Sequence, residues 1–402
     1  MNILKKTYCR IFQTAFKIAL PLLPYREPEI MNSVDEIIPL LKNKSYESVL
    51  LVTDKVIREL GITKNLEDLL AQNNIACHVY DETVPNPTID NVEAARNMYL
   101  SNNCKAIIAF GGGSSMDCAK ACGARIAKPK QPIPKMKGIL KVLKKIPMLI
   151  AIPTTAGTGS ETTLAAVITD SKLHHKYPIN DFNLIPNYAV LDYRTTVGLP
   201  QHITSTTGMD ALTHAVEAYI GNSTTKYTRK RAIEAVKLIN ENLKDAYDDG
   251  HNQTARSNML KAAYSAGVAF TQSYVGYVHA IAHSLGGQYG TPHGLANAVI
   301  LPILLREYGP VIYPKLATLA KESGVVTDTV LPEKDAALKF IDWVQEMNDS
   351  MNIPRNIPQI KDEDIETMAK HADKEANPLY PVPVLKDEKA LAQWYVLVRD
   401  NK

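Results

Sequence analysis

The stretch KAIIAFGGGSSMDCAKA, residues 105–121, decides the fold class of this chain. A short apolar run ends in three glycines and two serines, and a helical sequence begins near Asp117. Glycine lets the backbone approach a phosphate closely, and the amide groups at a helix start attract its negative charge. Met116 stands where the G-x-G-x-x-G fingerprint would have its last glycine, so the turn is not that fingerprint. The stretch predicts a strand, a turn that can hold a phosphate, and a helix.

Similar apolar runs alternate with helical segments from about residue 48 to residue 195. The predicted strands are SVLLVTD, ACHVYD, KAIIAFGGG and PMLIAIPTT, and the helices between them include NLEDLLAQNN and TIDNVEAARNMYLSNN. Thr88 is placed to cap the second of these helices. Strands that alternate with helices indicate a doubly wound parallel sheet. We therefore predict an α/β N-terminal domain that is Rossmann-like.

The β-rich runs stop after Leu199-Pro200, and nearly everything beyond has helical periodicity. Examples are GMDALTHAVEAYI, VHAIAHSLGG and LANAVILPILLREY. This change predicts an all-α C-terminal domain. We expect three parts: a basic amphipathic helix at residues 1–24, the α/β domain at 25–197 and the helical domain at 198–402.

Composition narrows the classes of partner. A chain of 402 residues, 45% of them hydrophobic, can bury a large core and is long enough for two domains. The formal charge of +3 is a small difference between 45 basic and 42 acidic residues, so nothing favours a nucleic acid as partner. The five cysteines are sparse and odd in number, which fits free thiols rather than disulfides. Composition favours a small-molecule partner and a cytoplasmic location.

The first twenty residues alternate basic and apolar side chains at helical spacing, the basic ones being Lys5, Lys6, Arg10 and Lys17. The apolar run IALPLLP is too short for a signal peptide, and no small-residue cleavage site follows it. We expect this helix to pack on the body of the protein or on a neighbouring subunit, and contact with a membrane surface is the alternative. No stretch is long and apolar enough to span a bilayer.

A second polar loop follows the next predicted strand, in IPTTAGTGSETT at residues 152–163. Its glycines expose backbone and its hydroxyls can donate hydrogen bonds, so two loops at neighbouring strand ends could flank one extended ligand. Asp54 ends the first strand, where a carboxylate can accept hydrogen bonds from ribose hydroxyls and repels a 2′-phosphate. This favours NAD over NADP. A simpler role for Asp54 is to cap the helix that follows.

Three histidines and an aspartate form a candidate metal site in the second half of the chain. Asp210 and His214 are four residues apart on an apolar helix, so both project from one face. His279 and His283 have the same spacing, and His293 follows a glycine-rich turn. Imidazoles with one carboxylate suit iron, zinc or cobalt better than magnesium or calcium. Buried histidines bonded to backbone are the alternative explanation for each one taken singly.

Together these motifs resemble a known family. The segments PNPT (residues 85–88), GGGSSMDCAK, IPTTAGTGSETT, GMDALTHAVEAY and the three-histidine stretch follow the order seen in the iron-containing, or group III, alcohol dehydrogenases. The resemblance extends over roughly residues 25–400. It implies a metal-dependent NAD-type oxidoreductase that moves hydride between an alcohol or aldehyde and nicotinamide. It also implies a homodimer or larger assembly.

The resemblance assigns roles to particular residues. It makes Asp210, His214, His279 and His293 the ligands of Fe²⁺ or Zn²⁺, and places the catalytic residue His283 near the nicotinamide as a proton relay or an orienting residue. Phe270 and Ala165 resemble apolar pocket walls, which suggests a small aliphatic substrate. The remaining carried-over positions would contact the cofactor: Asp54, Asn86, Gly112, Gly113, Ser114, Asp117, Thr154, Thr155, Thr158, Lys176 and Thr196.

Other readings share parts of this pattern. A glycerol dehydrogenase or a dehydroquinate synthase would use the same scaffold, although a different ligand spacing would be expected. A non-catalytic assembly protein could keep the fold, but a decayed copy should have lost at least one of the four ligands. The complete set therefore favours an alcohol dehydrogenase or aldehyde reductase.

Overall fold

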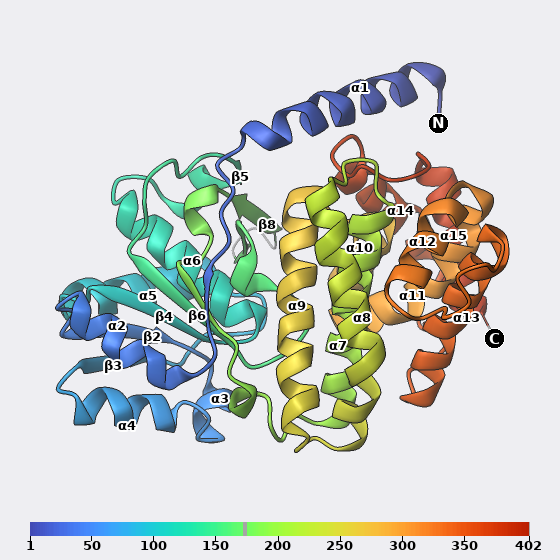
Figure 1. The fold of residues 1–402 in the computed structure, drawn as a ribbon. Coiled ribbons are helices and arrows are strands. Elements are labelled where there is room, and N and C mark those ends of the chain that lie inside the picture. The colour runs from blue at the N-terminus through green and yellow to red at the C-terminus, as the bar shows by residue number, and fades with distance from the viewer. Residues whose placement is uncertain (172–174, 402) are drawn as a thin grey trace. The chain divides into compact units, whose positions relative to one another are not determined.

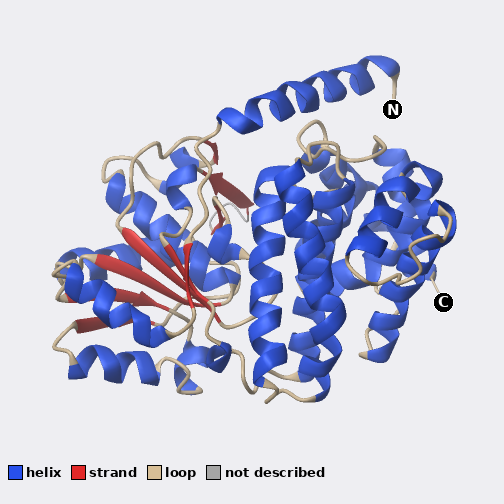
Figure 2. Cartoon of the chain, in the orientation of Figure 1, coloured by secondary structure: helices blue, strands red, loops and turns tan. Residues whose placement is uncertain are grey.

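The computed structural model describes residues 1–171 and 175–401 (Figure 1). The chain divides into two compact units. We call residues 24–197 the α/β unit, and residues 1–23 together with 198–402 the helical unit. Each unit has its own architecture. Figure 2 shows the strands in the α/β unit, whereas helices dominate the helical unit.

The α/β unit is built on a six-stranded sheet in which every neighbouring pair is parallel. The strand order is β1-β9-β6-β4-β2-β3. Their bounds are β1 Glu29–Met31, β2 Ser48–Val52, β3 Ala76–Tyr80, β4 Ala106–Gly111, β6 Met148–Pro153 and β9 Tyr188–Val190. The four strands predicted from the sequence are all present. The short strands β1, at one edge of the sheet, and β9, beside it, were not predicted.

Helices cover both faces of this sheet. In β2, Leu50 and Val52 pack into a core with α5 and α6, whereas Val49 and Leu51 pack into a second core with α2 and α4. Alternate residues of a strand point to opposite faces, so an unbroken apolar strand can serve two cores. The doubly wound prediction is confirmed. The helices are α2 Ile37–Asn43, α3 Lys55–Glu59, α4 Lys64–Gln72, α5 Ile89–Ser101 and α6 Gly113–Ala127.

Two local features differ from the sequence-based expectation. Helix α6 begins at Gly113 rather than near Asp117, because Gly112 takes the cap position directly after β4. A second, three-stranded sheet in the order β5-β8-β7 contains an antiparallel hairpin that was not predicted. Its strands are β5 Gly138–Ile139, β7 Ala165–Asp170 and β8 His175–Asn180.

The helical unit contains no strand among the described residues, as predicted for this half of the chain. Helices α7, α8 and α9 lie side by side (Figure 1). Gly208 permits close packing of α7 on α8, since a Cβ at this position would come within 2.3 Å of a Leu243 methyl group. The helices are α1 Ile3–Ala19, α7 Gln201–Ile220, α8 Lys226–Asp248, α9 Gln253–Ser273, α10 Tyr277–Tyr289, α11 His293–Tyr308, α12 Tyr313–Glu322, α13 Glu333–Ser350, α14 Asp362–Ala376 and α15 Glu388–Asp400.

Short 3-10 helices connect the main elements: η1 Leu20–Leu22, η2 Val34–Glu36, η3 Ile133–Met136, η4 Ser160–Thr162, η5 Phe182–Leu184, η6 Tyr193–Thr195 and η7 Gly309–Val311. Within the described residues, no single helix is long and apolar enough to cross a membrane. One pair, His293–Val311 with Tyr313–Glu322, meets the length and composition criteria together, but it is bent by 119°.

Helix α1 packs on the body of the helical unit. Gln13 is buried, and its amide donates to the Tyr380 carbonyl at 2.7 Å. The Arg10 guanidinium donates to the carbonyls of Val382 and Pro383, both at 2.9 Å. The ring of Phe16 meets that of Tyr274 edge to face at 5.2 Å. These contacts fix which face of α1 points inward.

Candidate metal centre and nucleotide-binding loops

Three helices bring the four predicted metal ligands together. Asp210 and His214 lie one turn apart on α7, His279 lies in the first turn of α10, and His293 is the first residue of α11. One ligand atom from each lies within 4.8 Å of all the others. From Asp210 Oδ1, the Nε2 atoms of His279 and His293 are 3.9 and 3.4 Å away. The arrangement can coordinate one ion.

The state of His279 fits a metal ligand. Its Nδ1 lies 2.6 Å from Glu217 Oε2, while its Nε2 is buried and has no hydrogen-bond partner among the described residues. Burial lowers the pKa of His279 well below its ordinary value, and the neighbouring histidines lower it further. The ring is therefore neutral. With the proton on Nδ1, the lone pair of Nε2 points into the cluster and is available for an ion.

Glu217 was not predicted from the sequence, although it lies only three residues after His214 on α7. Besides His279, its carboxylate accepts from the backbone amides of Gly276 at 2.7 Å and Val278 at 2.8 Å. Burial raises the pKa of Glu217 to about 7, and these donors oppose that rise. A Cβ at position 276 would come within 2.6 Å of Glu217 Oε1, so only glycine fits there. A glutamate in an otherwise apolar helix was the available signal.

Asn297 is a second missed neighbour. It is fully buried on α11, one turn after His293. Its Nδ2 donates to Asp210 Oδ1 at 2.6 Å and lies 3.1 Å from His293 Nε2. The amide thus holds the carboxylate ligand in place from the side of α11.

His283 lies outside the four-residue cluster but beside it. Its ring stacks on that of His293, with centroids 5.1 Å apart, and its Nδ1 lies 2.6 Å from Glu375 Oε1. The Tyr380 hydroxyl donates to the same Glu375 oxygen at 2.7 Å. Burial raises the pKa of Glu375, yet His283 and the Tyr380 hydroxyl outweigh it and hold the pKa below its usual value. The side chain of His283 is 43% exposed, so its ring contacts both His293 of the cluster and solvent.

Phe270 lies where an apolar wall was expected. Its ring stacks on that of His214 at 4.2 Å with an angle of 16° between planes. Ala165, the other predicted wall position, is the first residue of β7 in the α/β unit.

In the α/β unit, the two predicted loops are neighbours. Gly111 has φ of +152°, and the Thr154 amide donates to its carbonyl at 3.1 Å. A Cβ at Gly113 would lie 3.4 Å from the Thr158 methyl carbon, and one at Gly112 would lie 3.8 Å from Thr155 Oγ1. No side chain caps the N-terminus of α6. The structure therefore brings the glycine turn, the threonine loop and a helix start together, as expected of a phosphate site.

Buried Lys120 holds the threonine loop, and the sequence reading missed it. Its ammonium donates to the Ser160 carbonyl and Thr163 Oγ1, both at 2.7 Å, and to the Ala165 carbonyl at 3.0 Å. Burial lowers the pKa of Lys120 to about 8. Burial also raises the pKa of Glu161, on the same loop, to about 7. A lysine within the small-residue helix AKACGARIA was the available signal.

Asp117 is tied into the unit rather than left open. Its Oδ2 accepts from the Val167 amide at 3.1 Å and its Oδ1 from Ser160 Oγ at 3.3 Å. Burial raises the pKa of Asp117 to about 6. These bonds connect α6 to β7 and to the threonine loop. A contact of Asp117 with pyrophosphate stays a prediction.

Asp54 does cap α3, the simpler role considered above. Its Oδ1 accepts from the Ile57 amide at 2.9 Å, while Oδ2 lies 3.5 Å from Ser115 Oγ. The Lys176 ammonium donates to Asn86 Oδ1 at 2.5 Å. The Asn86 amide in turn lies 3.4 Å from Ser114 Oγ, so three predicted cofactor residues form one chain of contacts.

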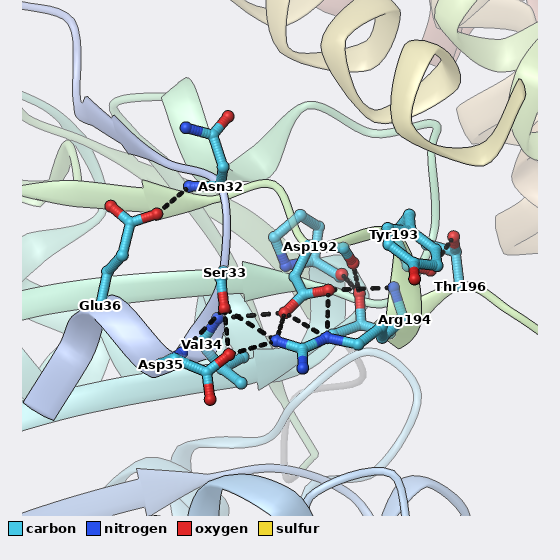
Figure 3. A network of polar contacts seen from close by, with 11 residues as sticks. Asn32, Ser33, Val34, Asp35, Glu36, Asp192, Tyr193, Arg194 and Thr196 are labelled. Atoms are coloured by element: carbon cyan, nitrogen blue, oxygen red, sulfur yellow. Dashed lines mark hydrogen bonds and ion pairs between the residues drawn. The ribbon is translucent and has the colours of Figure 1, made fainter. Parts of the chain in front are cut away.

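Thr196 belongs to a polar network at the end of the α/β unit (Figure 3). Its hydroxyl donates to the Tyr193 carbonyl at 2.9 Å. Beside it, Arg194 Nη2 donates to Asp192 Oδ2 and Asp35 Oδ2, both at 2.6 Å, and the two carboxylates raise the pKa of the guanidinium. Asp192 Oδ2 also accepts from the Val34 amide at 3.0 Å. The network holds the backbone around Thr196.

The chain thus combines a parallel α/β unit that has a phosphate-type turn with a helical unit that carries an Asp/His₃ cluster able to coordinate one ion. The model of "Iron-containing alcohol dehydrogenase" matches residues 31–193, and that of "Fe-containing alcohol dehydrogenase family, C-terminal" matches residues 204–392. The chain belongs to the iron-containing alcohol dehydrogenase family, which confirms the resemblance. Helix α1 lies outside both matched ranges.

Curated relatives cover most of the chain. Alcohol dehydrogenase 4 of Saccharomyces cerevisiae is 38% identical over 89% of this chain and 92% of its own length. The 1,3-propanediol dehydrogenase of Citrobacter freundii is 36% identical over 94% and 97%, respectively. The NAD-dependent methanol dehydrogenase of Bacillus methanolicus is 36% identical over 85% and 89%.

Solved structures share the fold. A 1,3-propanediol oxidoreductase matches with a TM-score of 0.88 at 33% identity, over 93% of this chain and 99% of its own. The sulfoacetaldehyde reductase of Bifidobacterium kashiwanohense, solved in complex with NAD⁺, matches with a TM-score of 0.83 at 27% identity, over 94% and 99%.

Proposed function

We propose that the protein is an NAD-dependent alcohol dehydrogenase and aldehyde reductase that holds Fe²⁺ or Zn²⁺ on Asp210, His214, His279 and His293. The observation that carries the proposal is the convergence of these four side chains within 4.8 Å in a member of this family. Three imidazoles and one carboxylate are a donor set suited to either ion.

The ion would supply Lewis acidity toward the substrate oxygen. The chain's own residues then have distinct tasks. Glu217 fixes the Nδ1 proton of His279, so that Nε2 faces the cluster. Asn297 orients the Asp210 carboxylate. His283, held at Nδ1 by Glu375 and partly exposed, passes the substrate hydroxyl proton to solvent.

The cofactor proposal rests on the α/β unit. Pyrophosphate would lie on Gly112, Gly113 and Ser114 at the start of α6, where backbone amides and the helix dipole favour anions. Asp54 would accept from the adenosine ribose and disfavour a 2′-phosphate, which favours NAD over NADP. The other residues proposed to line the cofactor are Asn86, Asp117, Thr154, Thr155, Thr158, Lys176 and Thr196. One relative is named NAD-dependent, and another was solved with NAD⁺.

The substrate proposed is a small aliphatic alcohol or its aldehyde. The Phe270 ring against His214 gives the metal cluster an apolar neighbour. Relatives named for propanediol and methanol support the same size class. A homodimer or larger assembly is proposed from family resemblance, and a reducing, cytoplasmic setting from the five free cysteines.

The test is anaerobic purification, measurement of bound iron and zinc, and NADH absorbance with a panel of small alcohols, diols and aldehydes. We expect one ion per chain and turnover that disappears with chelator and returns with metal. Glycerol as the sole substrate would favour a glycerol dehydrogenase instead. Absence of both metal and NADH binding would reject the proposal in favour of a non-catalytic protein.

A further inference from the structure

Helix α1 and the η1 turn after it carry an apolar stripe that the described residues of the helical unit leave exposed. Its members recur at intervals of four and three residues, so they lie on one face of the helix. Leu4, Ile18 and Leu22 are 83%, 71% and 85% exposed. The full stripe is Leu4, Tyr8, Ile11, Ala15, Ile18 and Leu22.

The opposite face of α1 holds the helix on its own unit. Cys9 and Gln13 are buried, and Gln13 and Arg10 donate to backbone carbonyls in the 378–383 segment. At 100° per residue, Gln13 lies opposite the centre of the stripe. The orientation of α1 is therefore fixed, and the exposed stripe faces away from the core.

A shallow apolar groove of about 770 Å³ runs beside the stripe. Ile11 and Ile18 form one wall, and the segment Pro383–Leu385 forms the other, with Lys6 also lining it. Stripe and groove together make one continuous apolar surface. A surface of this kind marks an interaction site when it is rimmed by polar or charged groups.

The charge carried by α1 is positive, and at 100° per residue Lys6, Arg10 and Lys17 lie on the face away from the stripe, where an interfacial helix carries its cations. No acidic residue precedes Glu27, whereas α1 carries four basic side chains. Asp373 and Asp387 are near, but they pair with Lys5 and with the terminal amine. Burial lowers the pKa of Lys315 on α12 to about 8, and the positive charges of Lys17, Arg229 on α8 and Arg10 act in the same direction. Exposed Lys226 and Lys230 extend the basic region along α8.

A second copy of this chain is a poor occupant for the surface. Two α1 helices paired through their stripes would bring two sets of lysines together, whereas paired helices use complementary flanking charges. An anionic bilayer answers both features, since its boundary region takes apolar side chains and its headgroups attract cations. We propose that α1 docks the protein on an anionic lipid surface, with the helix lying in the plane of the interface.

The experiment is cosedimentation of the full-length protein with vesicles. One set contains phosphatidylcholine alone, and the other contains phosphatidylcholine with phosphatidylglycerol. We expect binding to the anionic set that weakens as salt increases. The paired substitution Ile11→Asp with Ile18→Asp should abolish it, and Lys6→Glu with Lys17→Glu should weaken it about tenfold or more. Val330→Asp, at an 88% exposed position elsewhere in the helical unit, is the matched control and should bind as the parent protein does.

Metal content and turnover should be equal in all four proteins, because none of the changed residues lies at the metal ligands. Equal binding to neutral and anionic vesicles, or no binding to either, would overturn the proposal. So would an assembly in size-exclusion chromatography that dissociates in the Ile11→Asp, Ile18→Asp protein, since that assigns the stripe to a second copy. Capture of an acidic protein through the stripe with no lipid binding would also reject it.

Discussion

The two candidate sites are built by opposite strategies. In the α/β unit the nucleotide loops come from short runs of neighbouring residues, and Lys120 holds the threonine loop through the Ser160 carbonyl and Thr163 Oγ1. In the helical unit the ligands span residues 210–293, and His279 Nε2 is buried without a hydrogen-bond partner in the described chain. A buried, unsatisfied polar atom costs about 1–3 kcal/mol. The cluster thus presents a buried ligand atom that an ion would satisfy, and the glycine turn presents an uncapped helix start that a phosphate would satisfy.

The largest effect is expected from removing one metal ligand, which should disrupt the metal cluster and leave the nucleotide loops intact. His279→Ala should lose the ion and reduce turnover to background, because it removes a buried metal ligand. NADH binding should persist. Metal analysis and NADH fluorescence titration measure the two separately. His251→Ala, at an exposed position in the same unit, should change neither. An active, metal-free His279→Ala protein would disprove the ligand assignment.

The second prediction concerns Glu217, which contacts the predicted metal ligand His279. Glu217→Gln keeps the size of the side chain but replaces one acceptor oxygen by a donor: Oε2 contacts the Gly276 amide and His279, and Oε1 accepts from the Val278 amide. Metal affinity should fall by about 10–100-fold, as is typical for partners of histidine ligands. Competition with a chelator gives the affinity. Glu241→Gln, at an exposed position on α8, is the control. An unchanged affinity would reduce Glu217 to a purely structural residue.

A third substitution, in the α/β unit, should affect the nucleotide loops and leave the metal cluster unchanged. Lys120→Met removes the cation that holds the threonine loop, and should lower unfolding free energy by about 1–3 kcal/mol. The KM for NAD should rise more than kcat falls, and metal content should not change. Exposed Lys130→Met provides the comparison. Loss of metal in Lys120→Met would contradict the independence of the two sites.

The smallest effect concerns pH. Burial raises the pKa of Glu161 to about 7, so the folded chain prefers the protonated acid, and this contribution to stability is lost as pH rises through about 7. The stability of Glu161→Gln relative to the parent protein should therefore rise between about pH 5 and about pH 8. Melting temperatures across this range measure it. A constant difference between the two proteins would mean that Glu161 does not titrate there.

The sequence predicted features that depend on local pattern. Strands β2, β3, β4 and β6, the Thr88 cap of α5 and the Asp210/His214 pair all follow from spacing along one element. The hairpin of β7 and β8 was missed because its strands are only partly apolar, with buried and exposed positions interleaved.

Partners that meet only through tertiary packing were also missed. Glu217 contacts a histidine 62 residues away, and Asn297 contacts an aspartate 87 residues away. No local spacing encodes such pairs. They became visible once α7, α10 and α11 were packed together.

His293 differs from its three companions in being 37% exposed, at the first residue of a helix and beyond a glycine in the left-handed region. Helix ends open more readily than buried helix interiors. Local release of this one ligand would let the ion enter or leave without unfolding of the unit. Loading can therefore follow folding, and a chelator would strip the protein at the rate of that local opening.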